Sequence, residues 1–336
     1  MSTMTEEKER KVEGGETRED ALVALVERAR AARESDERDD DERARAMAIV
    51  TELMANVANG RTAGGRARER AQKGAEEVVA CARVGSGDEC ARVVAEVMRA
   101  VEIAVGCLPC DESRERVVRE TIVHGLVHRS SAVRVASTRA LGAALDAGDR
   151  RGLVKYLTGC HAPTMASRAM NYFGALICDG SASVRTEFTR VLGRCLVEDD
   201  GAAPRVLPYV LTSLRDDIDD VRDAAQEIVN AMGTEKFNNL VRRNLGDILI
   251  PALDELSAHA GTGWQEHITF RTLTLINTLV CYANDCVIQF VPNIYDGMRA
   301  VIANERTEAR AKIEAQGVLS ALVSVCPDAA VLLQSG

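Results

Sequence analysis

Aromatic residues are scarce in this chain: they make up 3% of 336 residues and include one Trp. Proline is also rare, at seven residues, and the alternation of apolar and polar residues that is typical of strands is nearly absent. Ala, Val, Arg, Leu and Glu dominate, a composition that favours helices. Because the chain is longer than one core usually holds, the sequence predicts several domains or an array of helical repeats.

Positive charge is the second deficit, since 42 Lys and Arg face 51 Asp and Glu, for a net charge of −9. Proteins that bind nucleic acid usually carry a basic surplus, because neutralising phosphates supplies much of their affinity. No block of Lys and Arg here lacks interleaved acids. The sequence therefore predicts no nucleic-acid partner, and its acidity favours protein partners.

Long apolar runs and targeting signals are also lacking. No run reaches the roughly 18 residues of a membrane-spanning helix, so no membrane partner is expected. The N-terminus, "MSTMTEEKERKVEGGETRED", is too acidic for a signal or transit peptide. The ten cysteines lie mostly in apolar helical runs, where free Cys acts as a small hydrophobe. A reducing, cytoplasmic location is the expectation.

Catalytic motifs are missing as well. None of the five His lies in a nucleophile elbow, a phosphate-binding loop or an H-E-x-x-H helix. Trp264, in "GTGW", is interpreted as anchoring a loop, with stacking on a ligand as the alternative. The sequence therefore predicts no enzyme activity, no cofactor and no small-molecule substrate.

Four residues have the spacing of a small zinc module, C-x2-C-x13-H-x3-H: Cys107, Cys110, His124 and His128. A zinc finger needs apolar residues four and ten positions after its second Cys, and these positions hold Arg114 and Glu120. No thioredoxin-like pattern surrounds the two cysteines either. The interpretation is an inter-helix turn followed by a repeat helix; a zinc site and a redox pair are the alternatives, and no metal is predicted.

The chain divides into three predicted parts. Residues 1–19 are highly charged without an apolar period, which predicts a disordered tail. Residues 20–110 indicate degenerate helical repeats. Residues 111–336 show a clear repeat pattern, interpreted as a solenoid that ends early, as in a shortened homologue, a partial gene model or a fragment.

Two markers recur in that last part. An apolar residue followed by a basic one opens the second helix of each pair: Val133-Arg134, Val184-Arg185, Val221-Arg222, Phe270-Arg271 and, more loosely, Ala311-Lys312. A proline marks the preceding helix: Pro208, Pro251 and Pro292. These are predicted structural positions, and the prolines indicate a shared kink or a shared first-turn placement. A period near about 40–47 residues is typical of HEAT and armadillo repeats.

The predicted fold is therefore an all-α solenoid of HEAT/armadillo-type two-helix repeats, in which each unit packs on its neighbours. The alternative is an irregular helical bundle, which does not explain the recurring markers. Acidic residues come before the basic residue of the marker, as Asp216 comes before Arg222. Their negative charge suits the N-terminus of a helix. Each Arg can then bridge to an acid of its own turn or of the adjacent unit; independent surface pairs, worth about 0–1 kcal/mol each, are the alternative.

Four stretches resemble the HEAT-repeat axonemal dynein assembly factors of ciliated and flagellated cells. They are "HRSSAVRVASTRALGAAL", "SASVRTEFTRVLGRCLVED", "LPYVLTSLRDDIDDVRDAAQEIVNAMG" and "WQEHITFRTLTLINTLVCYANDCVIQFVPNI". The resemblance implies a non-enzymatic cytoplasmic scaffold for pre-assembly of dynein arms, with dynein chains, chaperones and other assembly factors as partners. It assigns no binding residues. Another HEAT/armadillo adaptor, such as a transport receptor or a phosphatase scaffold, is the alternative function.

Overall fold

The computed structural model describes residues 72–76, 78–79, 90–159, 171–198, 200–259 and 266–327, and these residues contain helices and turns but no strand. The predicted tail, residues 1–19, much of the predicted degenerate repeats and Trp264 lie outside these ranges. The chain divides into two compact units, Met1–Gly148 and Asp149–Gly336. The predicted division at residues 19 and 110 stays a prediction.

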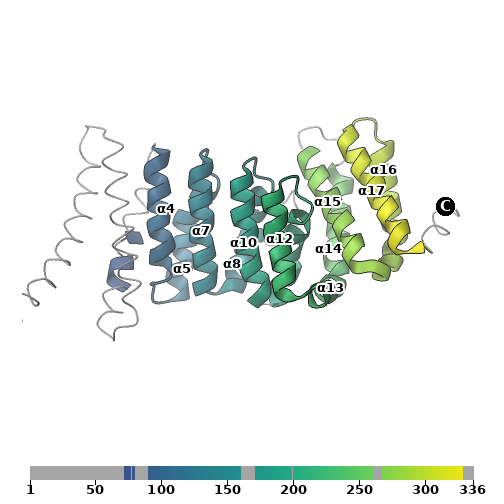
Figure 1. The fold of residues 1–336 in the computed structure, drawn as a ribbon. Coiled ribbons are helices and arrows are strands. Elements are labelled where there is room, and N and C mark those ends of the chain that lie inside the picture. The colour runs from purple at the N-terminus through teal and green to yellow at the C-terminus, as the bar shows by residue number, and fades with distance from the viewer. Residues whose placement is uncertain are drawn as a thin grey trace, which may run out of the picture. The chain divides into compact units, whose positions relative to one another are not determined.

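Two long helices pack together in the described part of the first unit. From residue 90 on, its elements are α4 (Ala91–Val105), α5 (Asp111–Val117), a π-helical turn η2 (Val118–Ile122), α6 (Val123–Leu126) and α7 (Ser131–Ala147). α4 and α7 pack along each other (Figure 1), and Val94, Met98 and Val133 are buried between them. α6 packs closely on α7, because Gly125 has no Cβ where Ser137 lies.

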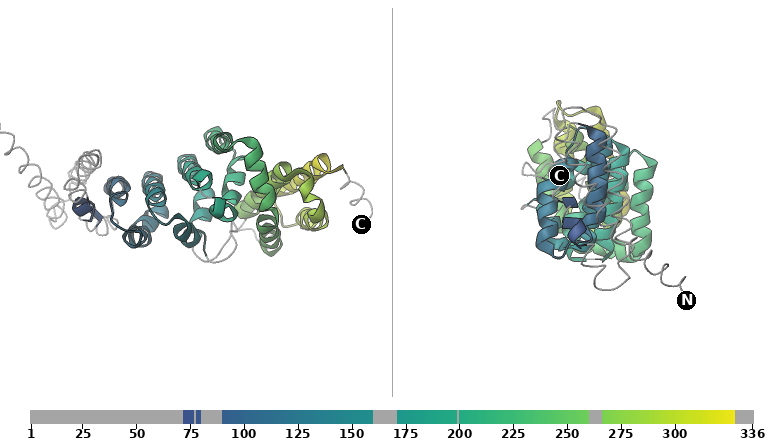
Figure 2. Two further views of the ribbon diagram at one scale, coloured as in Figure 1. Left: turned by 90° about the horizontal axis from the view of Figure 1, so that it is seen from below. Right: turned by 90° about the vertical axis from the view of Figure 1, so that its left-hand side faces the viewer.

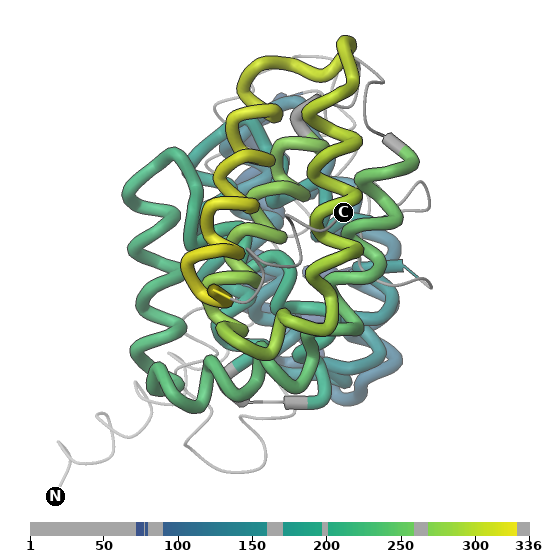
Figure 3. The backbone as a smooth tube through the Cα atoms, turned by 90° about the vertical axis from the view of Figure 1, so that its right-hand side faces the viewer, coloured from purple at the N-terminus to yellow at the C-terminus, as the bar shows by residue number. Residues whose placement is uncertain are grey.

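The second unit is a succession of helix pairs. Its elements are α8 (Arg150–Thr158), α9 (Tyr172–Ile177), α10 (Ala182–Glu198), η3 (Asp200–Ala202), α11 (Ala203–Ser213), α12 (Asp219–Met232), α13 (Thr234–Arg243), α14 (Leu245–His259), α15 (Glu266–Ala283), a 3-10 segment η5 (Asn284–Phe290), α16 (Val291–Ala303) and α17 (Ala309–Val325). Within this unit the helices stand in two layers (Figure 2), and the last pair, α16 and α17, runs antiparallel (Figure 3).

Neighbouring pairs share their apolar faces. The first helices α11, α14 and α16 pack in one layer; in the other, α10 packs on α12, and α15 on α17. This stacking of two-helix repeats confirms the predicted fold class, an all-α solenoid of the HEAT/armadillo type. A single pair could not bury its apolar face alone.

The apolar-basic markers lie where the second helices begin. Val133, Val184 and Val221 are each the third residue of their helix and are fully buried. Ala311 has the same position in α17, whereas Phe270 is the fifth residue of α15. Burial of the Val in the first turn anchors the start of these helices, and Val133 packs there against Val94 and Met98 of α4.

The three prolines do not share one position within their helices. Pro208 and Pro251 lie inside α11 and α14, whereas Pro292 is the second residue of α16. Pro292 takes a position where its missing N–H costs nothing, because the first N–H groups of a helix have no intrahelical partner. The prolines therefore mark the first-helix layer without marking one shared turn.

One apolar stretch, Ile268–Ala303, is long and apolar enough by composition to cross a membrane. It comprises most of α15, together with η5 and α16, and 56% of its apolar window is buried inside the protein. Buried core helices share this composition, so the stretch is weak support for a membrane span.

Candidate functional site

The turn between α11 and α12 holds a buried polar cluster. Asp216 lies in this turn and is 2% exposed, although a carboxylate is rarely buried without partners. Arg185, in the first turn of α10, and Arg271, near the start of α15, both point toward it. The three side chains come from three successive repeats, and we call them the Asp216 junction.

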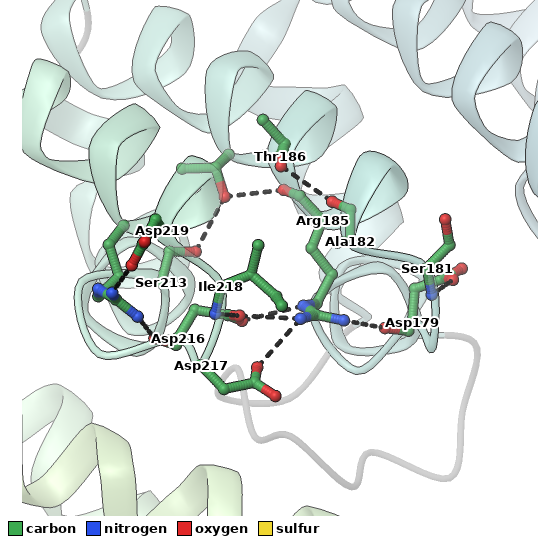
Figure 4. Close-up of polar contacts among 12 residues, drawn as sticks. Asp179, Ser181, Ala182, Arg185, Thr186, Ser213, Asp216, Asp217, Ile218 and Asp219 are labelled. Atoms are coloured by element: carbon green, nitrogen blue, oxygen red, sulfur yellow. Dashed lines mark hydrogen bonds and ion pairs between the residues drawn. The ribbon is translucent and has the colours of Figure 1, made fainter.

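Arg185 binds the Asp216 carboxylate through two parallel hydrogen bonds. Its Nε donates to Oδ2 at 2.9 Å and its Nη2 donates to Oδ1 at 2.8 Å (Figure 4). The planar guanidinium matches the carboxylate in this arrangement, which makes it one of the stronger protein ion pairs. Nη2 also donates to Asp217 Oδ1 at 3.1 Å.

Two further donors complete the environment of Asp216. Arg271 Nη1 donates to Oδ2 at 2.9 Å, and the backbone N–H of Ile218 donates to Oδ1 at 3.0 Å. Burial by itself would raise the pKa of Asp216, but the hydrogen bond from Arg185 and the charge of Arg271 outweigh it and lower the pKa to about 2. The carboxylate is therefore ionised throughout the physiological range.

A second regularity concerns the backbone. In four helices, the Arg at the fourth position donates to the carbonyl oxygen six residues before it: Arg114 to Leu108, Arg134 to His128, Arg185 to Asp179 and Arg222 to Asp216. These carbonyls lie in the turn before the helix, where no helical N–H satisfies them. In three of these helices the Arg is the basic member of the apolar-basic marker, and in all four it ties the turn to the helix that follows.

The predicted bridge from an Arg to an acid of the adjacent unit is present in one repeat, and a local contact takes its place in the next. Arg185 reaches the turn of the adjacent repeat, as described above. Arg222, in the equivalent position, instead pairs with Asp219 of its own helix, and the two side chains are 40% and 82% exposed. Both bridging modes considered from the sequence therefore occur.

The residues with zinc-like spacing occupy different environments. Cys107 is buried and its thiol donates to the Ile103 carbonyl, whereas Cys110 is exposed and lies 3.2 Å from Ser113 Oγ. His128 Nδ1 accepts from Ser130 N–H, and burial lowers the His128 pKa. In the described part of the chain, no three His, Cys, Asp or Glu side chains converge as metal ligands.

Some structural residues were not found from the sequence. Asn171 caps α9 by accepting from Gly174 N–H at 2.8 Å, and the same Oδ1 accepts from the Tyr209 hydroxyl at 3.1 Å. Tyr209 packs edge-on against Phe173 and Phe188 in the core. An Asn directly before an apolar helix is a sequence signal for an N-cap. The sequence contains no signal that Tyr209, 38 residues away, would bind the same oxygen.

Comparison with known families gives one match. Residues 111–240 match the family model described as dynein axonemal assembly factor 5-like, TPR repeats. This confirms, for these residues, the resemblance to axonemal dynein assembly factors that the sequence suggested. The matched segment includes Arg185 and Asp216, while Arg271 lies beyond it. No curated protein matches the chain.

Several solved structures are similar. An engineered protein has a TM-score of 0.40 at 13% identity, over 91% of this chain and 98% of that one. A designed armadillo repeat protein has a TM-score of 0.40 at 11% identity, over 90% of this chain and 99% of that one. A chain from a structure of Kap95p binding to RanGDP has a TM-score of 0.43 at 15% identity. The match covers 94% of this chain and 39% of that one. Matches this weak carry no argument about function.

Proposed function

We propose that this protein is a non-enzymatic scaffold that acts in the cytoplasm, in the pre-assembly of axonemal dynein arms. The observation that carries the proposal is the match of residues 111–240 to the dynein axonemal assembly factor 5-like family. The proposed partners are dynein chains together with chaperones or other assembly factors. No nucleic acid, membrane, cofactor or small-molecule substrate is part of the proposal.

The chemistry of the described residues supports a scaffold role. The charged side chains of the Asp216 junction are engaged with one another and with backbone groups, so they stabilise repeat stacking. Stacked repeats offer an extended surface on which large protein partners can be held. Dynein chains, which must associate with several other subunits, are partners of that kind.

The test is disruption of the gene in a flagellated cell, followed by electron microscopy of axonemes. The expected result is loss of outer or inner dynein arms, with restoration by the unaltered gene. Dynein heavy chains should also co-purify with the tagged full chain from cytoplasm. Normal arms in the disrupted cells would overturn the proposal, and co-purification of other protein assemblies would then favour a different HEAT/armadillo adaptor function.

A further inference from the structure

The turns that precede α7, α10 and α12 share one hydrogen-bond pattern. Three residues before each of these helices begins, a side chain accepts the backbone N–H two residues further on. In the second unit the accepting side chain is an Asp. Asp179 Oδ1 accepts from Ser181 N–H at 2.8 Å before α10, and Asp216 Oδ1 accepts from Ile218 N–H at 3.0 Å before α12.

His128 takes the place of the Asp in the turn before α7. Its Nδ1 accepts from Ser130 N–H at 3.0 Å, and its carbonyl oxygen accepts from Arg134 Nη1 at 2.8 Å. Ser130, the residue before α7, supplies no side-chain cap of its own. A ring nitrogen accepts a hydrogen bond only while it carries no proton, so this turn requires a neutral imidazole with its proton on Nε2.

The surroundings of His128 oppose a charged ring. Burial lowers the pKa of His128 below its ordinary value of 6.5, and the positive charges of Arg129 and Arg134 act in the same direction. Among the described residues, no acidic side chain acts on this pKa. His124, one turn earlier in α6, is exposed. Protonation of His128 would thus remove an acceptor and add a positive charge beside two arginines.

We propose that the turn between α6 and α7 is an acid-sensitive joint, in which protonation of His128 breaks its bond to Ser130 and loosens the start of α7. The turns before α10 and α12 stay intact over the same pH range, because an Asp carboxylate keeps its acceptor oxygens well below neutral pH. α6 packs on α7, so this joint controls how firmly the two helices are held together. The proposal concerns the first unit and does not depend on a role in dynein assembly.

The pH range of the joint follows from the direction of the shift. The pKa of His128 is lower in the folded protein than its ordinary value of 6.5, so the neutral ring contributes fully to stability above that value. The contribution is lost as pH falls through the pKa of the folded state. This loss comes at higher pH than the loss from Asp216, whose pKa is lowered to about 2.

The first experiment is an NMR titration of the unaltered full chain from about pH 7.5 to about pH 5, a range that brackets the ordinary pKa of His. The Ser130 amide proton is expected to shift upfield as its hydrogen bond is lost, with the same midpoint as the His128 ring. The amide protons of Ser181 and Ile218, which bind Asp side chains, should keep their positions and serve as internal references. A Ser130 amide that does not follow the His128 ring, or a midpoint at or above 6.5, would overturn the proposal.

Two histidine variants separate this turn from other effects of acid. His128→Asn keeps an acceptor that does not titrate, in the way that Asn304 Oδ1 accepts from Arg306 N–H at 2.9 Å before α17. His124→Asn is the matched control, because His124 is exposed one turn away. Between about pH 7.5 and about pH 5, the melting temperatures of the unaltered protein and His124→Asn should fall relative to that of His128→Asn.

A constant difference in melting temperature between the unaltered protein and His128→Asn across this range would refute the joint. The same holds if His124→Asn behaves like His128→Asn, since the effect would then not belong to this turn. Circular dichroism establishes that the variants are folded. Should His128→Asn fail to fold, the titration of the unaltered chain decides by itself, because its references lie in the same molecule.

Discussion

The first turns of α10 and α12 have the same marker and different consequences. Arg185 and Arg222 each follow a buried Val at the fourth helical position and bind the carbonyl six residues back. Arg185 is 6% exposed and joins the next repeat, while Arg222 is 40% exposed and pairs with Asp219. The shared backbone contact belongs to the marker, whereas the contact with another repeat depends on what the neighbouring repeat places opposite it.

The strongest test of this difference removes the acid at each position. Asp216→Ala leaves Arg185 buried without its carboxylate, and breaking a buried pair in this way costs about 3–5 kcal/mol of unfolding free energy. Asp219→Ala removes an exposed partner and should cost less than about 1 kcal/mol. Denaturant unfolding measures both, and similar losses would show that the junction is not the stabilising contact.

Removing the arginines should have a smaller effect. Arg185→Met should cost about 2–3 kcal/mol, less than Asp216→Ala, because Asp216 keeps Arg271 and the Ile218 N–H as donors. Arg222→Met should cost about 1 kcal/mol or less, since its ion pair is exposed. Equal melting temperatures for the two variants would contradict the comparison.

The last expected effect, smaller than the loss in Asp216→Ala or Arg185→Met, is a dependence on pH. The pKa of Asp216 is lowered to about 2 in the folded protein from an ordinary value of 3.8, so its stabilising contribution is complete above that ordinary value. This contribution, about 1–2 kcal/mol, is lost as pH falls from about 4 to about 2. Unfolding curves of the unaltered protein and Asp216→Asn should therefore converge with acid; a constant difference between pH 5 and pH 2 would refute the lowered pKa.

Most of the repeat architecture could be predicted because it depends on local patterns. The apolar residue at the third helical position and the acidic turn before it are both visible in short stretches of sequence. The contacts of Asp216 were less predictable, because Arg185 and Arg271 lie 31 and 55 residues away. The sequence suggested that Arg could bridge to the adjacent unit without indicating which Arg would do so.

The zinc-like spacing is a second case in which a sequence pattern does not determine which side chains meet. Cys107, Cys110, His124 and His128 match a ligand pattern in sequence, but the turn and helix they belong to give them separate environments. Arg114 and Glu120 occupy the two positions where a finger needs apolar residues, and this pattern alone argues against a finger. Arg114 instead binds the Leu108 carbonyl and closes the turn.

The sequence by itself determined the helical class, the two-helix repeat and the position of the marker, since each follows from composition and short-range periodicity. The tertiary structure decided which Arg of the marker is buried, which acid it meets, and that α13 packs on both α12 and α15. These features depend on how the repeats stack. A charge gains most from a partner where stacking excludes water, and that place is set by residues distant in the chain.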